Sequence, residues 1–204
     1  NIMLSVVSLL LPHREGRLID IIYQKRFLEQ GPRIVAIGGG TGLSTILHGI
    51  KEYTSNITAI VTVADDGGSS GRLRQQFDIV APGDIRNCLV ALANEETMMH
   101  ELFQYRFKKE TEFSGHSFGN LFITAMTQVT GDFERAIKES SKILSIRGRV
   151  LPSTVDKVTL VAEHKDGRIT EGEAQIPKAG SPVKRIFIRP KEAVGASDAI
   201  HAIQ

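Results

Sequence analysis

The chain has 204 residues, with 25 basic and 23 acidic side chains and a net charge of +2. This near balance argues against a dedicated nucleic-acid binder, whose surface usually carries a strong basic excess. The single cysteine, Cys88, excludes an internal disulfide and a cysteine-rich metal site, and it suits a reducing compartment. Apolar residues make up 41% of the chain, enough to fill the core of an ordinary α/β domain.

Residues 1–30 are interpreted as an N-terminal extension. Residues 2–11 are mostly apolar and end at Pro12, but this run is shorter than the ~20 residues that span a bilayer. Because no basic segment precedes it and no cleavage site follows it, a signal peptide is not expected. We expect a packed terminal helix, with weak membrane association as the alternative, and a second helix over residues 17–29.

The next segment predicts a nucleotide-binding type of core over residues 31–149. Residues 33–37 form a short apolar run typical of a buried strand, residues 43–50 predict a helix, and residues 57–64 predict a second strand. A strand–helix–strand unit of this kind makes its strands parallel. Further helices are expected over 84–94, 97–106, 117–129 and 132–144.

After residue 150 the apolar residues no longer follow helical spacing and instead recur at every second position. Strands are expected over 157–163, 168–176 and 184–189, with Asp166-Gly167 as a hairpin turn between the first two. We interpret residues 150–190 as an antiparallel β meander and residues 191–204 as the start of a helix returning to the core. The predicted class is therefore α/β, with a parallel sheet, helices on both faces and a small meander. Because a doubly wound sheet usually has more strands than the two clear ones, we expect a C-terminally truncated part of a longer fold.

A glycine loop follows the first predicted strand and consists of Gly38, Gly39, Gly40, Thr41 and Gly42. Glycines let the backbone approach a ligand, and the N-terminus of the following helix attracts phosphate. The dinucleotide fingerprint fails because Leu43 stands where it requires glycine, and the P-loop fails because no lysine follows. The loop thus predicts phosphate binding, the alternative being a tight turn without a ligand.

A second loop follows the second predicted strand and holds two adjacent carboxylates. Ligands of open α/β sheets bind beyond the carboxyl ends of the strands. Carboxylates there can bond a ribose, hold Mg²⁺ or polarise a nucleophile, and an arginine can bind an anion. The alternative is a solvated Asp-Gly turn. The candidate residues of this loop are Asp65, Asp66, Gly67, Gly68, Ser69, Ser70 and Arg72.

Two further loops complete the candidate site. Asp84 can cap the helix that follows it or contribute to the ligand site, and Arg86 and Asn87 in the first turn of that helix can point at the same cleft. His116, Ser117 and Asn120 lie at the start of another helix, where the charged form of a histidine is disfavoured; a structural histidine is the alternative. No set of residues has zinc spacing, and neither Ser44 nor Ser117 stands in a nucleophile elbow. Cys88 is expected in the core.

Five motifs together resemble the YvcK family of gluconeogenesis factors, relatives of the CofD-like 2-phospho-L-lactate transferases. The resemblance implies a Rossmann-like fold and a cytoplasmic protein that binds UDP-sugars such as UDP-N-acetylglucosamine, linked to cell shape and gluconeogenic growth. It implies ligand contacts from the four loops, whereas the Gly-Pro-Gly-Ser loop usual in the family is absent here. Residues 1–30 look like the extension of cyanobacterial-type members. The motifs are VAIGGGTGLS (35–44), TVADDGGSSGRLR (62–74), PGDIRNCL (82–89), GHSFGNL (115–121) and RGRVLP (147–152).

Three functions remain open at this point. The first is a non-enzymatic regulator that binds a nucleotide-sugar. The second is a Mg²⁺-dependent transferase of the phospho-lactate type, with Asp65 and Asp66 near the metal. The third, a nicotinamide oxidoreductase, is disfavoured by the broken fingerprint. We expect a small-molecule nucleotide-sugar as the partner and no nucleic acid; homo-oligomer formation and protein partners stay open.

Overall fold

The computed structural model describes residues 25–93, 98–108 and 111–204. Residues 25–29 are helical, as expected for the end of the helix at 17–29. The apolar segment of the expected N-terminal extension lies outside the described residues.

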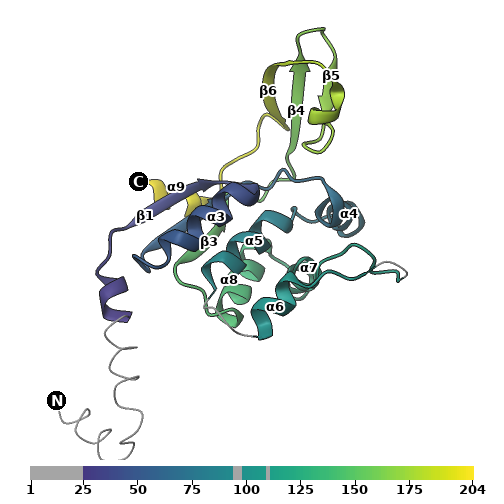
Figure 1. The fold of residues 1–204 in the computed structure, drawn as a ribbon. Coiled ribbons are helices and arrows are strands. Elements are labelled where there is room, and N and C mark those ends of the chain that lie inside the picture. Colours follow the sequence, from purple (N-terminus) through teal and green to yellow (C-terminus); the bar gives the residue numbers. More distant parts are fainter. Residues whose placement is uncertain (1–24, 94–97, 109–110) are drawn as a thin grey trace, which may run out of the picture.

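A three-stranded parallel sheet forms the centre of the molecule (Figure 1). Its strands are β1 (Ile34–Gly38), β2 (Ile57–Val61) and β3 (Arg149–Pro152), in the order β1-β2-β3. Both neighbouring pairs are parallel. Every residue of β2 is buried, because this strand is flanked on both edges and covered on both faces.

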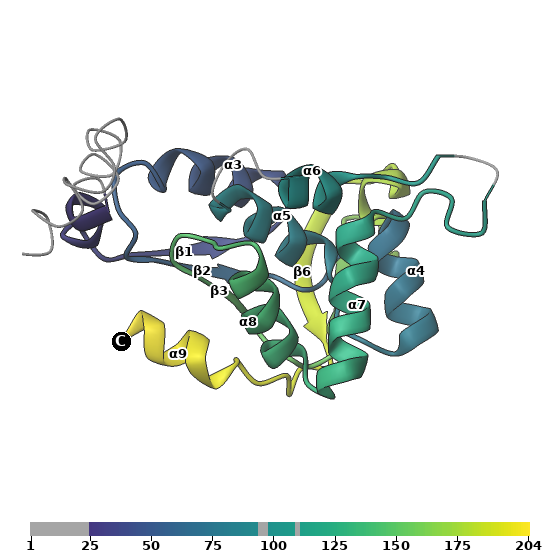
Figure 2. The same ribbon diagram turned by 90° about the horizontal axis from the view of Figure 1, so that it is seen from below.

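Helices cover both faces of this sheet, as the sequence predicts (Figure 2). On one face, Ala59 and Val61 of β2 belong to the main apolar core together with residues of α3, α5 and α8. On the other face, Ile60 packs against Ala196 and Ala199, at the start of α9. The helices are α3 (Gly40–Ile50), α4 (Gly68–Phe77), α5 (Gly83–Leu92), α6 (Met98–Gln104), α7 (Phe118–Thr130), α8 (Phe133–Ile143) and α9 (Ser197–Ile203).

A small antiparallel sheet projects from this body (Figure 1). It contains β4 (Thr159–His164), β5 (Ile169–Glu171) and β6 (Val183–Arg189). The antiparallel sheet is confirmed, but the expected meander is wrong because β4, not β5, is the central strand. The chain leaves β5 early, at Gly172 with a φ of 96°, and passes through the 3-10 helix η1 (Ile176–Ala179) before β6.

The third parallel strand corrects a second expectation. Residues 149–152 pair with β2 in the core sheet, whereas the sequence places the antiparallel unit from residue 150 onward. The strand has only four residues, too few for its period to be distinguished from that of the strands that follow. Gly148 just before it has a φ of 90°, which sets the direction in which the chain enters the sheet.

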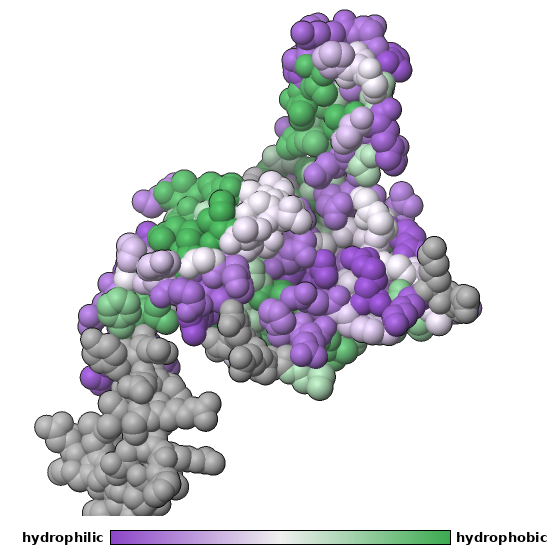
Figure 3. Space-filling view, in the orientation of Figure 1, coloured by the Kyte–Doolittle hydropathy of each residue, from purple (hydrophilic) through white to green (hydrophobic). Residues whose placement is uncertain are grey.

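Apolar side chains remain on parts of the surface (Figure 3). Val35 and Ile37 of β1 are 40% and 61% exposed, and Ile186 of β6 is 54% exposed. Among the described residues, none of the helices combines the length and the apolar character that a membrane crossing requires.

Replacement of Gly148 by alanine tests the packing of β3. A Cβ built at Gly148 lies 2.5 Å from the carbonyl oxygen of Ile57 and would also stand at a positive φ. We expect Gly148→Ala to lower the free energy of unfolding by roughly 2–4 kcal/mol, because strain and overpacking add. Chemical denaturation followed by circular dichroism measures the change.

The matched control is Gly49→Ala in α3. A Cβ at Gly49 meets nothing within 4 Å. This exposed helical position should gain about 0.5 kcal/mol, since alanine loses less backbone entropy on folding. Equal stabilities for the two variants would contradict the close packing of residue 148 against β2.

Candidate functional site

The glycine loop forms the turn between β1 and α3. The strand extends to Gly38, and the helix begins at Gly40, three residues earlier than its sequence predicts. A Cβ at Gly39 would overlap the side-chain oxygen of Thr62, so only glycine allows this close approach between the loop and the residue after β2. Gly40 has a φ of 60°, and Cβ atoms built at Gly40 or Gly42 would meet nothing within 4 Å. The loop therefore presents its backbone to open space at a helix N-terminus.

Asp84 holds this loop from the neighbouring helix. Its Oδ2 accepts a hydrogen bond of 2.7 Å from the backbone N–H of Gly40. The expectation that Asp84 caps its own helix is wrong, because α5 begins after Pro82 and has no side-chain cap. Burial raises the pKa of the Asp84 carboxyl, the bond from Gly40 lowers it and the charge of Asp65 raises it further. The net effect is a raised pKa.

The adjacent carboxylates of Asp65 and Asp66 point to different partners. Asp65 accepts the N–H of Gly67 at 2.9 Å, and its Oδ2 lies 2.9 Å from a Cβ built at Gly83, at the start of α5. Asp66 accepts the N–H of Ala174, in the segment between β5 and η1, at 2.9 Å. Asp65 therefore lies near the start of α5, where its charge raises the pKa of Asp84, whereas Asp66 ties the antiparallel sheet to the body.

Glu173 approaches these carboxylates from the antiparallel sheet. Burial and the charges of Asp65, Asp84 and Asp66 raise its pKa. The described residues contain no group of three or more histidine, cysteine, aspartate or glutamate side chains placed to hold a metal ion. Mg²⁺ is commonly held by one or two carboxylates together with substrate phosphates, a number that Asp65 and Asp84 can supply.

The second half of the second motif is helical rather than an open loop, and its two serines are buried. α4 begins at Gly68, and Ser69 and Ser70 are buried in its first turn. The hydroxyl of Ser69 bonds to Nδ1 of His116 at 3.0 Å and accepts from the amide of Asn120 at 3.1 Å. These side chains therefore join the starts of α4 and α7.

The remaining residues of the fourth motif support the same junction. Ser117 is fully buried and caps α7 by accepting the N–H of Asn120. Burial lowers the pKa of His116, and the charges of Arg72 and Arg106 lower it further, which favours the neutral imidazole. Arg72 donates to the carbonyl of Ser114 at 2.7 Å. Contacts of these residues with a ligand stay a prediction.

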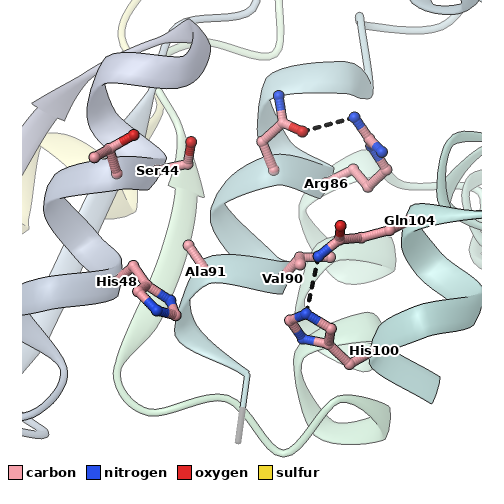
Figure 4. A pocket seen from close by; sticks show the side chains of 9 residues that line it. Ser44, His48, Arg86, Val90, Ala91, His100 and Gln104 are labelled. Atoms are coloured by element: carbon pink, nitrogen blue, oxygen red, sulfur yellow. Dashed lines mark hydrogen bonds between the residues drawn. The ribbon is translucent and has the colours of Figure 1, made fainter. Parts of the chain in front are cut away.

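A groove of about 490 Å³ lies beside the glycine loop, between α3, α5 and α6 (Figure 4). Arg86 and Asn87 line it, as the sequence suggests, and are joined by a bond of 2.6 Å. Burial lowers the pKa of Arg86, as does the charge of Arg106. Cys88 is a buried core residue, as expected, and burial raises the pKa of its thiol to about 12.

The other side chains of the groove were not anticipated. His48, His100 and Gln104 belong to none of the motifs, and Ser44, the last residue of the first motif, was considered only as a nucleophile. These four side chains come together through the packing of α3 and α6 against α5. The spacing of Ser44 and His48 by one helical turn is the only trace in the sequence, and it is too common to indicate a site. The sequence did not indicate Glu173 either, because this residue approaches the carboxylates of Asp65 and Asp84 from the distant antiparallel sheet.

Comparison with known proteins shows which family this chain belongs to. A Bacillus subtilis protein named "Gluconeogenesis factor" is 51% identical over 175 residues, which are 86% of this chain and 55% of that protein. A Nostoc sp. (strain PCC 7120) relative is 58% identical over 200 residues, 98% of this chain and 44% of its own length. The family described as "2-phospho-L-lactate transferase CofD" matches residues 34–204.

The chain belongs to the CofD family. Among its relatives are gluconeogenesis factors, as the resemblance implies. The crystal structure of a Bacillus halodurans protein superposes with a TM-score of 0.82 at 51% identity and covers 85% of this chain and 56% of that one. The fold of the CofD-family core is thereby confirmed, and the chain spans about half the length of the curated relatives it matches.

Two substitutions at Asp84 test its bond to the glycine loop. Because the folded-state pKa lies above the ordinary value of 3.8, the ionised carboxylate destabilises the fold, and stability falls as the pH rises through that window. Asp84→Asn keeps an oxygen for the Gly40 N–H but carries no charge. We expect it to be more stable than the wild-type protein at pH 7, with the advantage gone below about pH 3.8.

Asp84→Ala removes the acceptor itself and is the comparison for this measurement. It should be less stable than Asp84→Asn by about 1–3 kcal/mol at both pH values, because the Gly40 N–H loses its partner. Urea denaturation at pH 7 and pH 3.5 measures both effects. If the asparagine and alanine variants were equally stable, the bond would contribute nothing.

Proposed function

We propose that this protein is a cytoplasmic regulator that binds a nucleotide-sugar of the UDP type at the glycine loop. The diphosphate would lie over Gly40 and Gly42, with the remaining ligand extending over the adjacent helices. The observation that carries the proposal is the open space above these two glycines at the N-terminus of α3.

Helix geometry supports an anion at this position. The first N–H groups of an α-helix have no partner within the helix, and the dipole adds positive potential there. Asp84 takes the N–H of Gly40, and those of Thr41 and Gly42 follow in the same exposed turn. The carboxylates of Asp84 and Asp65 would repel a diphosphate, so a Mg²⁺ ion held by them would strengthen its binding.

The link to carbon metabolism comes from the relatives. The Bacillus subtilis and Halalkalibacterium halodurans proteins are both named "Gluconeogenesis factor", at 51% and 52% identity. We extend this link to the present chain, and with it the roles in gluconeogenic growth, cell shape and cell-wall morphogenesis that the family resemblance implies. A ligand that reports on nucleotide-sugar supply would connect these roles.

A second candidate is a phospho-lactate transferase. The matching family description names that activity, and Asp65 and Asp84 lie together beside the glycine loop. In such an enzyme the two carboxylates would hold a Mg²⁺ ion, which would neutralise charge on the phosphates during transfer. The Bacillus subtilis relative is named a gluconeogenesis factor and not a transferase, which favours the regulator.

Substitution of Gly42 by leucine tests the phosphate site. The new side chain would extend into the open space above the loop without a clash inside the protein. We expect UDP-N-acetylglucosamine to bind at least tenfold more weakly, since the ligand loses access to the helix N-terminus. Isothermal titration calorimetry measures the affinity, and circular dichroism checks the fold.

Gly49→Leu provides the control in the same helix. It also adds a side chain where nothing lies within 4 Å, but near the far end of α3. Its affinity should equal that of the wild-type protein. Equal affinities for all three proteins would place the ligand elsewhere.

Titration with and without Mg²⁺, followed by incubation with a phospho-lactate donor and its acceptor, separates the two functions. A regulator binds the nucleotide-sugar and releases it unchanged. Formation of a phospho-lactyl product would support the transferase and contradict the proposed regulator.

A further inference from the structure

We propose that the groove between α3, α5 and α6 is a sugar-binding subsite that holds the hexose end of a nucleoside-diphosphate sugar. This inference rests on the proposed function, because the diphosphate at the glycine loop would direct its two ends across the neighbouring helices. It adds the part of the ligand that the groove recognises and the residues that recognise it.

The groove begins close to the glycine loop. Ser44 lies in α3 two residues after Gly42, and Asn87 lies about one turn after Asp84, whose carboxylate bonds the loop at Gly40. From there the groove extends along α3 to His48 and reaches Gln104 of α6 (Figure 4). Its volume of about 490 Å³ is within the range of small-molecule sites.

The polar groups of the groove match hydroxyl groups better than an anion. The Asn87 oxygen is occupied by Arg86, which leaves its amide N–H groups as donors. The Gln104 nitrogen lies 2.8 Å from Nε2 of His100, and an amide nitrogen only donates, so the amide oxygen remains as an acceptor. Figure 4 shows this oxygen turned away from His100 towards the end of the groove where Arg86 lies.

Other polar atoms extend this mixture of donors and acceptors. The Nε of Arg86 is a buried donor without a hydrogen-bond partner among the described residues. The hydroxyls of Ser44 and Thr45 donate to the carbonyl of Thr41, so their lone pairs remain as acceptors. A sugar hydroxyl both donates and accepts, whereas a phosphate or carboxylate only accepts. A lining that offers both kinds of group therefore favours a sugar.

The remaining lining residues favour a sugar over the nucleobase as the occupant. The nine residues include no phenylalanine, tyrosine, tryptophan, aspartate or glutamate, and the aromatic rings among them are those of His48 and His100. Val90 and Ala91 of α5 provide a short apolar strip between the polar groups. Such a strip suits the C–H face of a hexose ring, because that face is apolar while its rim carries the hydroxyls.

The groove is also largely preformed. Arg86 is held through its bond to Asn87, and its stem packs beneath Gly119, where a Cβ would lie 2.8 Å from the Arg86 Cδ. Gln104 is held through its bond to His100. Side chains that are already ordered lose little entropy when a ligand binds, which favours affinity for a small sugar.

Gln104→Leu tests the subsite with UDP-N-acetylglucosamine and UDP as the two probes. The substitution keeps the size of the side chain but removes the acceptor and the bond to His100. We expect the affinity for UDP-N-acetylglucosamine to fall about tenfold and the affinity for UDP to change less than about twofold. Calorimetric titration of the full chain measures both.

Gln76→Leu on the exposed surface of α4 is the matched control, and neither affinity should change in it. An equal loss of affinity for both probes in Gln104→Leu would place the nucleoside in the groove. No loss of affinity for either probe would show that the groove binds no part of the ligand. Both results overturn the proposal. If the wild-type protein bound neither probe, the proposed function would fail. Free N-acetylglucosamine followed by NMR would then test the groove alone: shifts at Ala91 and Gln104 support it, and their absence overturns it.

Discussion

The buried carboxylate of Asp84 is the constraint on which the rest of the site depends. It links two segments 44 residues apart by accepting the N–H of Gly40, and so fixes the glycine loop relative to α5. The same contact aligns the first turns of α3 and α5, between which the groove opens. Burial makes the ionised form of the Asp84 carboxyl less favourable and raises its pKa. The hydrogen bond from Gly40 only partly offsets this effect of burial.

The polar and glycine-rich motifs are of two kinds: some hold helices together in the interior, and others leave open space at the surface. Ser69, His116 and Asn120 face one another in the interior, where their hydrogen bonds join α4 to α7. These bonds satisfy the Ser69 hydroxyl and the Asn120 amide nitrogen, whereas the Asn120 Oδ1 is buried without a partner among the described residues. The glycines of the first loop do the opposite, since Gly40 and Gly42 leave space beside the backbone. Motifs that look alike in composition thus form either the scaffold or the proposed ligand site.

The sequence predicted the elements whose signal is local. The glycine loop, the strand before it and the core position of Cys88 follow from neighbouring residues alone. The expectation that this strand is buried is wrong, because β1 lies at the edge of the sheet and leaves Val35 and Ile37 exposed. The strand β3 did not, because four residues carry too little periodicity, and the order of the antiparallel sheet depends on a crossover through η1. The partner of Asp84 was missed for a related reason, since a helix-capping residue and a residue that bonds across the fold have the same local sequence.

The bond from Ala174 to Asp66 couples the projecting sheet to the cleft. Asp66 is adjacent in the chain to Asp65, which faces Asp84, so a displacement at the base of the antiparallel sheet reaches the carboxylates within one residue. The tip of the hairpin at Asp166-Gly167 is far from this contact and exposed. Substitutions at the base of this small sheet are therefore expected to require compensating changes in the second glycine-serine motif, whereas at the tip the constraint is local, set by the φ of 84° at Gly167.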